Sequence, residues 1–115
     1  MSIEQRTAAQ ARNLKYSRTN KGRAVFLRKA YERIDACDMS TAEILAFIEQ
    51  PCVYCGTDTA NRGLDRIDNN LAHVKGNVQT ACTECNLIRG DRFTVEEMKR
   101  IGLIVAQIRA DRAHG

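Results

Sequence analysis

Two long stretches of the chain carry apolar side chains at helical spacing, and both are amphipathic. The stretch from residue 23 to about 36 has an apolar face opposite a basic one. That apolar face consists of Phe26, Ala30, Tyr31 and Ile34. The stretch near the C-terminus carries a narrower apolar stripe of Met98, Ile101, Val105 and Ile108. Both patterns predict helices that pack against a core, and the second predicts a helix of about four turns.

Capping signals mark further helices. Ser40 begins a capping box with Glu43, and the apolar run that follows predicts a short helix over 44–48. Pro51 disfavours helix at the preceding residue, so this helix is expected to stop just before it. A second capping box starts at Thr94 and introduces the C-terminal helix. Residues 3–15 are polar and rich in Ala and Gln, which favours one more helix with a weak apolar face.

The middle of the chain has a different pattern. Residues 64–68 and 77–81 are short enough to be strands, and a turn region rich in Asn and Gly joins them. Residues 83–89 then favour a helix that Gly90 ends. The sequence therefore predicts an α+β fold with helices on both sides of a hairpin.

Length and charge restrict the function classes. The chain has 115 residues, which indicates one domain, and its formal net charge is +4. Residues 1–33 carry nine basic and two acidic side chains, whereas 34–51 carry four acidic ones and no basic one. The basic N-terminal third favours a polyanionic partner over a merely solvated helix. No apolar run approaches membrane-spanning length, and the N-terminus lacks the apolar core of a signal peptide, so we expect an intracellular protein without a membrane partner.

Four of the five cysteines form two CxxC pairs. Cys52 and Cys55 are separated from Cys82 and Cys85 by 26 residues. In a chain without a secretory signal, such pairs are typical of metal ligands rather than disulfides. Four thiolates make a closed tetrahedral site, so the spacing predicts a structural Zn²⁺. Cys37 lies outside both pairs and is interpreted as a small, half-buried thiol.

The segment between the cysteine pairs carries the candidate chemistry. Asp65 offers a carboxylate and Asn86 an amide oxygen, and both are ligand types that Mg²⁺ or Mn²⁺ accepts. Arg66, next to the acid, has the planar fork that binds a phosphate oxygen. Hydrolysis of a phosphodiester needs charge stabilisation on the phosphate and an activated water, which a hard cation beside a phosphate-binding arginine can supply.

At these residues the sequence resembles a known family. The stretches Leu64–Asn69, Gly76–Val78 and Cys82–Asn86, together with the first CxxC pair, look like the HNH endonucleases with a ββα-metal fold, especially small phage-type members. The resemblance implies divalent-cation-dependent cleavage of DNA and a zinc that holds the hairpin to the following helix. It also leaves open a phage-encoded protein that acts in the host cell.

The resemblance assigns roles to individual residues. Asp65 falls on the family's metal-binding acid, Asn77 on the Asn that fixes the loop between the strands, and Asn86 on the last metal ligand. The family's general base is a His directly after the acid, and here that position is Arg66. An arginine is a poor base because its pKa lies above 12, so Arg66 is interpreted as a phosphate clamp.

Two residues are candidates to replace the missing base. His73 belongs to the residue type that most often serves as a general base, and it lies in the turn region of the hairpin. Asp68 is two strand positions from Arg66 and hence on the same face, although its position favours a role in pairing with Arg66 or in capping the Asn-rich turn. The predicted catalytic set is therefore His73, Arg66, Asp65 and Asn77.

Expected DNA contacts come from arginines outside the motif. They are Arg23, Arg28, Arg89 and Arg92, which would follow the backbone without reading bases. We thus predict a basic helical region over 1–50, a zinc-bound ββα core over 51–92 and a C-terminal helix over 93–115. The predicted function is a Mg²⁺- or Mn²⁺-dependent DNA endonuclease. The alternatives are a zinc-ribbon DNA-binding module that has lost cleavage, which Arg66 supports, and a zinc-stabilised protein-interaction module, which leaves the basic region unexplained.

Overall fold

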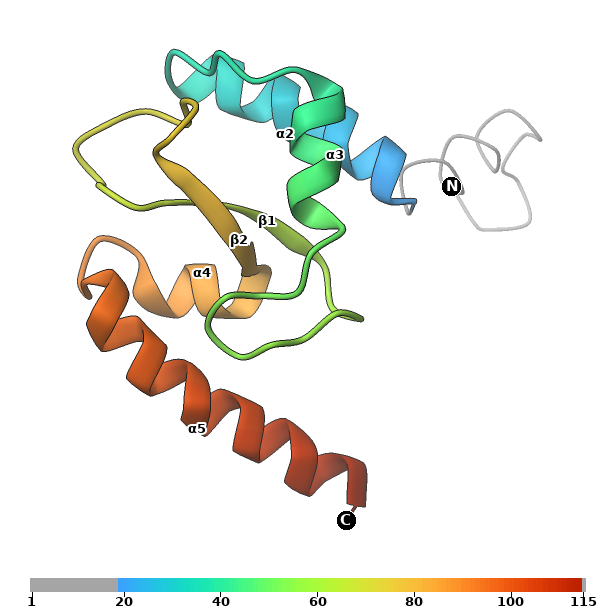
Figure 1. Cartoon of the computed structure of the whole chain (residues 1–115), viewed down its shortest axis with the longest axis vertical. Helices are drawn as coiled ribbons and strands as arrows, with labels where there is room; N and C mark the ends of the chain where they lie inside the picture. Colours follow the sequence, from blue (N-terminus) through green and yellow to red (C-terminus); the bar gives the residue numbers. More distant parts are fainter. Residues whose placement is uncertain (1–18, 115) are drawn as a thin grey trace, which may run out of the picture.

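The structure is a computed structural model that describes residues 19–114. Over these residues it contains four helices and one two-stranded antiparallel sheet, which confirms the α+β class (Figure 1). The elements are α2 (Asn20–Ile34), α3 (Thr41–Ile48), β1 (Arg62–Arg66), β2 (Val78–Cys82), α4 (Thr83–Arg89) and α5 (Val95–His114). The helix expected over residues 3–15 lies outside the described residues.

Local capping chemistry sets the starts of α2 and α3. The Thr19 hydroxyl accepts a hydrogen bond from the Gly22 N–H at 3.0 Å and begins α2. The predicted capping box of α3 is confirmed, because Ser40 and Glu43 each accept the other's backbone N–H. Side chains at these positions satisfy amide groups that the first helical turn leaves without partners.

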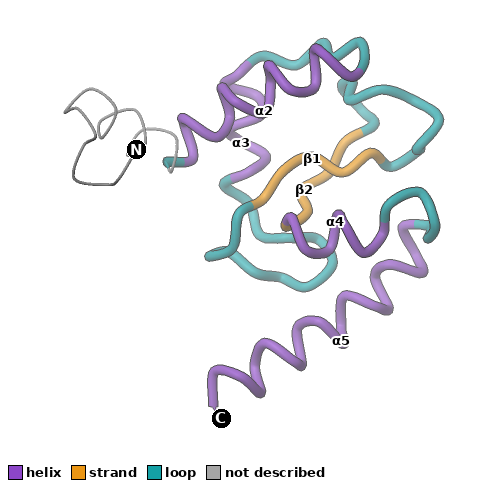
Figure 2. Tube along the Cα trace, turned by 180° about the vertical axis from the view of Figure 1, so that it is seen from behind, coloured by secondary structure: helices purple, strands orange, loops and turns teal. Residues whose placement is uncertain are grey.

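An apolar cluster lies between the helices α2 and α3 and the hairpin. We call this set the apolar cluster: Ala24, Leu27, Tyr31, Met39, Ile44, Ile48, Leu64 and Val78. Cys37 packs against it from the side and is half-buried. Figure 2 shows the two helices on one side of the hairpin, with α4 and α5 on the other.

The core-facing side of α2 differs from the predicted one. Phe26 and Ile34 are 60% and 72% exposed, whereas Leu27 is buried, so the prediction was wrong for two of its four residues. The physical reason is the Tyr31 hydroxyl, which accepts a hydrogen bond from the Leu64 N–H at 3.0 Å. That bond turns α2 so that Leu27, one turn before Tyr31, faces β1 at Gly63, where a Cβ would lie only 3.2 Å from the same hydroxyl.

The hairpin pairs Arg62 with Cys82 at one end and Arg66 with Val78 at the other. Both strands are displaced by one or two residues from their predicted bounds. Asp68 is outside β1 because its carboxylate accepts the Asn70 N–H at 2.9 Å, which forms a turn instead. The strands therefore end where the turn chemistry begins.

A second cluster lies on the opposite side, where α4 and α5 pack. We call it the metal-side cluster: Cys52, Tyr54, Ala81, Cys82, Cys85 and Met98. As predicted, α4 ends at Gly90, which has a φ of 49°. The second capping box is also confirmed by the reciprocal bonds of Thr94 and Glu97. Helix α5 approaches the backbone of Tyr54 closely at Gly102. Only a glycine fits there, because any Cβ would overlap with the Tyr54 carbonyl.

Helix α5 is longer than predicted, with 20 residues, and its apolar stripe is only partly covered. Ile101 and Val105 pack against the metal-side cluster, while Ile108 is 44% exposed. Among the described residues, no helix is long and apolar enough to cross a membrane.

Candidate functional site

The four cysteines of the CxxC pairs converge, as predicted. Cys52 and Cys55 come from the loop after α3, and Cys82 and Cys85 from the junction of β2 and α4. Their sulfur atoms all lie within 4.8 Å of one another, and those of Cys55 and Cys82 are 3.7 Å apart. Two thiolates bound at ~2.3 Å to one tetrahedral zinc are separated by about 3.8 Å, so the donor set fits Zn²⁺.

The thiols differ in acidity because their surroundings differ. Burial raises the pKa of Cys85, and the neighbouring sulfurs raise it further. Burial also raises the pKa of Cys82, but N–H donation from Cys85 and from the Arg109 guanidinium outweighs it and lowers that pKa to about 7. Four such groups so close together are stable as thiolates only with a cation among them, and zinc would supply that charge.

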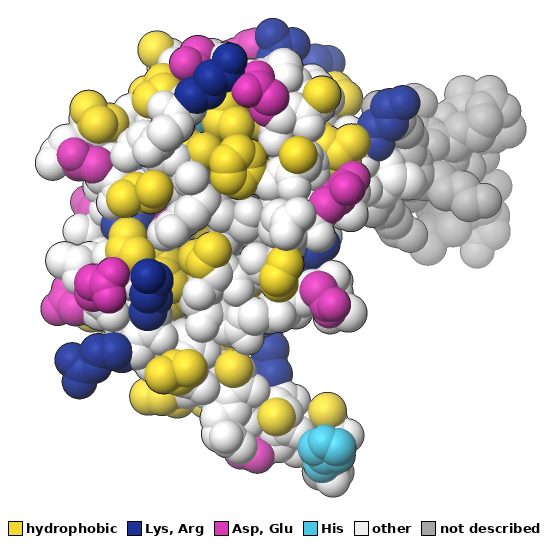
Figure 3. Space-filling view, in the orientation of Figure 1, with side chains coloured by type: hydrophobic (Ala, Val, Ile, Leu, Met, Phe, Trp, Pro, Cys, Tyr) yellow, Lys and Arg dark blue, Asp and Glu magenta, His cyan; other side chains and the backbone are white. Residues whose placement is uncertain are grey.

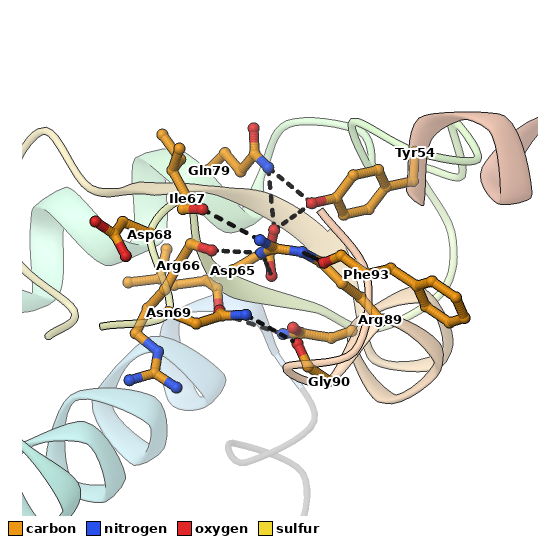
Figure 4. A network of polar contacts seen from close by, with 12 residues as sticks. Tyr54, Asp65, Arg66, Ile67, Asp68, Asn69, Gln79, Arg89, Gly90 and Phe93 are labelled. Carbon is orange, nitrogen blue, oxygen red and sulfur yellow. Dashed lines mark hydrogen bonds and ion pairs between the residues drawn. The ribbon is translucent and has the colours of Figure 1, made fainter. Parts of the chain in front are cut away.

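Asp65 lies at the centre of a buried polar network beside this cluster (Figure 4). One carboxylate oxygen accepts from the Arg89 guanidinium at 2.8 Å. The other accepts from the Tyr54 hydroxyl and from the Gln79 amide, the latter at 3.0 Å. Burial and the Asp65 carboxylate both raise the pKa of Tyr54, so its hydroxyl stays protonated and donates.

Arg89 is a structural residue, so the expectation that it contacts DNA was wrong. It is only 2% exposed. Besides Asp65, its guanidinium donates to the carbonyls of Arg66, Ile67 and Phe93. These carbonyls lie where β1 and α4 end, and such buried backbone groups need a donor. Arg89 thus joins the two elements instead of facing solvent.

Asn86 lies against the backbone of β1. Its side-chain N–H₂ donates to the Leu64 carbonyl at 3.2 Å, one residue before Asp65. It lines a groove of about 340 Å³ between α2 and α4 together with Arg23. Among the described residues the Asn86 amide oxygen has no hydrogen-bond partner, so it is available as a ligand atom.

A hard cation does not fit Asp65 as the side chain stands. The carboxylate already accepts three donors, is 3% exposed and faces the positive charge of Arg89. A carboxylate has about four acceptor positions, and a neighbouring guanidinium repels a divalent cation. Asn86, on α4, contacts β1, which carries Asp65, but the structure does not join their oxygens in one open site.

His73 is packed, although its position in the turn region favours an exposed residue. Its ring stacks on Tyr31, with centroids 4.0 Å apart, and Nδ1 lies 2.7 Å from the Asp35 carboxylate. The Asp35 carboxylate also accepts a hydrogen bond from the backbone N–H of His73 at 3.3 Å. The other ring nitrogen, Nε2, has no hydrogen-bond partner among the described residues. Every buried side-chain nitrogen there has a partner, so Nε2 is exposed to solvent.

The loop between the strands is held by Asn77. Its amide oxygen accepts the Asp68 N–H at 2.9 Å, and its N–H₂ donates to the carbonyls of Asp68 and Ala72. Asn77 is therefore a buried residue that fixes the loop carrying His73.

The remaining arginines differ in their freedom to bind a phosphate. Arg23 is half-buried and donates to the Arg62 carbonyl at 2.6 Å, and burial lowers its pKa. Arg28 forms an exposed ion pair with Glu32, and Arg92 donates to carbonyls at the end of α4. Arg66 is half-buried and has a single long bond to the Leu71 carbonyl. On the face in Figure 3, basic and acidic side chains are interspersed, without one basic patch.

Comparison with known proteins supports the fold. No protein-family model matches the chain. A 50-residue stretch is 36% identical to the uncharacterized protein R423 of Acanthamoeba polyphaga mimivirus, over 42% of this chain and 9% of that protein. The chain thus spans about a tenth of that relative's length.

The structural match covers much more of the chain. The rare-cutting HNH restriction endonuclease PacI is similar with a TM-score of 0.63, over 82% of this chain and 79% of the PacI chain, at 22% identity. An identity this low shows a shared fold only. The chain therefore shares the ββα fold of that HNH endonuclease, and its four-cysteine cluster joins β2 and α4 to the loop after α3, as the sequence predicts.

Sequence reasoning missed three residues that shape this region. Tyr54 lies inside the first CxxC pair, Asp35 ends α2, and Arg109 contacts the cysteine sulfurs from α5. Only the position of Tyr54 between two ligands was a signal in the sequence. The other two act across 38 and 54 residues of chain, a separation at which periodicity carries no information.

Proposed function

We propose that this chain is a metal-dependent DNA endonuclease of the HNH type. The observation that carries the proposal is the ββα core of β1, β2 and α4, in which a four-cysteine site joins β2 and α4 to the loop after α3, in a fold shared with an HNH restriction endonuclease. Because it would hold zinc on thiolates, such an enzyme suits a reducing compartment, and we place it inside the cell.

DNA is the proposed substrate, and Arg66 is the proposed phosphate clamp. Arg66 is the arginine of the motif whose guanidinium has the fewest bonds to the protein, and it lies at the end of β1. Arg28 and Arg92 are exposed and would add backbone contacts. Arg23 borders the groove with Asn86, where its remaining N–H groups would face a bound strand.

The proposed catalytic ion is Mg²⁺ or Mn²⁺, held first by the amide oxygen of Asn86. A hard cation there would stabilise charge on phosphate oxygens and activate water. Asp65 would contribute only if Arg89 gives up its bond to the carboxylate. Binding of the ion would therefore compete with the ion pair between Asp65 and Arg89. A stronger ion pair would require a higher concentration of Mg²⁺ or Mn²⁺ for cleavage.

His73 is the proposed general base, with Asp35 as its positioning residue. A hydrogen bond from Nδ1–H to Asp35 would fix the tautomer that leaves Nε2 free to accept a proton. The variant His73→Asn keeps a donor for Asp35 but removes Nε2. We expect it to reduce the cleavage rate by roughly 10²–10⁴-fold with DNA affinity unchanged. Cleavage at the wild-type rate would exclude His73 as the base.

A zinc-stabilised DNA-binding module without cleavage is the second candidate. Arg66 occupies the position of the family's base, and Asp65 is bonded to Arg89 instead of lying open to solvent. Both observations favour this reading, and they predict DNA binding that is independent of added Mg²⁺.

Nicking of supercoiled plasmid separates the two candidates. Protein with one zinc per chain is assayed without and with Mg²⁺ or Mn²⁺, next to Asn86→Ala at the same zinc content. The endonuclease proposal expects nicking that needs the added ion and is lost in Asn86→Ala. Inert wild-type protein that still shifts DNA in a gel would support the binding module, and protein inactive in both assays would contradict both proposals.

A further inference from the structure

One side chain outside the cysteine pairs contacts the candidate zinc ligands directly. Arg109, in the C-terminal half of α5, donates one guanidinium N–H to the Cys55 sulfur at 2.7 Å. The other terminal nitrogen lies 3.6 Å from the Cys82 sulfur and 2.7 Å from the Glu84 carboxylate. The guanidinium thus reaches one sulfur from each CxxC pair.

The charge of the site explains why a guanidinium lies there. Four thiolates around one Zn²⁺ carry a net charge of about −2, which the half-buried surroundings leave poorly solvated. A guanidinium stays protonated at any physiological pH and has two terminal nitrogens in a rigid plane. It can therefore donate to two sulfurs at once, which the single ammonium group of a lysine does less well.

Glu84 fixes the orientation of this guanidinium. Its carboxylate lies in the first turn of α4, two residues after Cys82, and accepts from the same nitrogen that faces Cys82. The Arg109 side chain is 27% exposed, and the ion pair holds it over the sulfurs rather than out in solvent. Groups in this outer layer of a metal site orient the ligands and tune their basicity.

We propose that Arg109 is an outer-sphere residue of the zinc site, which stabilises Cys55 and Cys82 as thiolates. It slows the release of zinc and makes the two sulfurs less nucleophilic. It also makes the docking of α5 depend on the metal, because its bonds are strongest to zinc-bound thiolates. This inference rests on the four-cysteine geometry and holds whether or not the protein cleaves DNA.

Competition with a chromogenic zinc chelator tests the effect on affinity. Arg109→Met keeps the aliphatic stem and removes the donors, and we expect zinc to bind about 10–100-fold more weakly. Arg109→Lys keeps the charge and should lie between this variant and the wild type. Arg112→Met is the matched control, because Arg112 is exposed on the same helix and has no contact with the cysteines in the described structure. It should retain wild-type affinity.

Cobalt substitution separates a direct bond to sulfur from simple packing of α5. In Co²⁺-loaded Arg109→Met the d–d bands should keep their tetrahedral pattern. The sulfur-to-cobalt charge-transfer band should shift to lower energy, because sulfur lone pairs without a donor are easier to oxidise. Alkylation of the zinc-loaded variant by iodoacetamide should also be faster than in the wild type.

Two outcomes would overturn the proposal. One is wild-type zinc affinity and alkylation rate in Arg109→Met. The other is weaker zinc binding in which Arg109→Lys equals Arg109→Met and the charge-transfer band does not move, since that pattern indicates packing alone.

Discussion

The two clusters on either side of the hairpin consist of different types of side chain. The apolar cluster contains Leu27, Ile44, Ile48 and Leu64, which are large aliphatic side chains. The metal-side cluster contains three cysteines, a tyrosine, an alanine and only one large aliphatic side chain, that of Met98. Burying a large aliphatic side chain contributes about 1.5–3 kcal/mol, so the fully buried residues of the second cluster contribute less than those of the first, and its other apolar side chains, such as Ile88, Phe93 and Ile101, are only partly buried.

The difference shows where the metal is needed. A domain of this size has little apolar core to spare, and the fully buried centre of its metal-side half holds thiols and a polar network, with apolar side chains only partly buried around it. Zinc would replace the missing core by joining β2, α4 and the loop after α3 at one point. The elements that carry the candidate site would therefore depend on a metal that does no chemistry itself.

Removing one zinc ligand should have the largest effect on folding, because the metal-side cluster then loses its metal. Cys85→Ser is expected to lose zinc and to unfold at least residues 52–92. Structural zinc contributes about 10–16 kcal/mol, which is as large as the whole stability of a small domain. Zinc analysis and circular dichroism measure the effect. Cys37→Ser, at a cysteine outside the site, is the control and should keep its zinc.

Breaking the buried ion pair should have the next largest effect. Asp65→Ala leaves the Arg89 charge buried without its carboxylate, and we expect a loss of about 3–5 kcal/mol in the free energy of unfolding. Asp65→Asn keeps an acceptor and should lose less, which makes it the better variant for assays of activity. Urea unfolding at constant zinc content measures both. Equal stability of Asp65→Ala and the wild type would contradict the role of this network.

A small change in the apolar cluster should lower stability without changing zinc affinity. Ile44 is fully buried, and Ile44→Val should reduce the free energy of unfolding by about 0.5–1.5 kcal/mol. Zinc affinity of the folded protein should not change, because Ile44 belongs to the other cluster. Chemical unfolding and chelator competition on the same sample test both parts. Weaker zinc binding in this variant would show that the clusters are not separate.

Local chemistry in the sequence predicted local structure well. Both capping boxes and the end of α4 at Gly90 follow from residues close together in the chain, and the convergence of the cysteine pairs follows from the metal-ligand spacing within each pair. Each of these features is decided within one turn of helix or one metal knuckle. The fold class follows from the same signals, because they fix the order of helices and strands.

Long-range partners could not be predicted in the same way. Phe26 and Leu27 fit a helical stripe equally well, and the hydrogen bond between Tyr31 and Leu64 decided between them. Arg89 looked like a surface arginine until β1 supplied carbonyls and a carboxylate for it. In both cases a polar group found its partner across the fold, and no periodicity encodes that choice.

Hydrogen exchange with and without zinc tests the central claim most directly. The wild-type protein is compared before and after removal of zinc by a chelator at neutral pH, and exchange is followed by mass spectrometry of peptides. We predict that amides in β2 and α4 lose their protection with the metal, and lose more of it than the amides of α2 do. Unchanged protection of β2 and α4 in zinc-free protein would contradict the account, because the hairpin and α4 would then hold together without the metal.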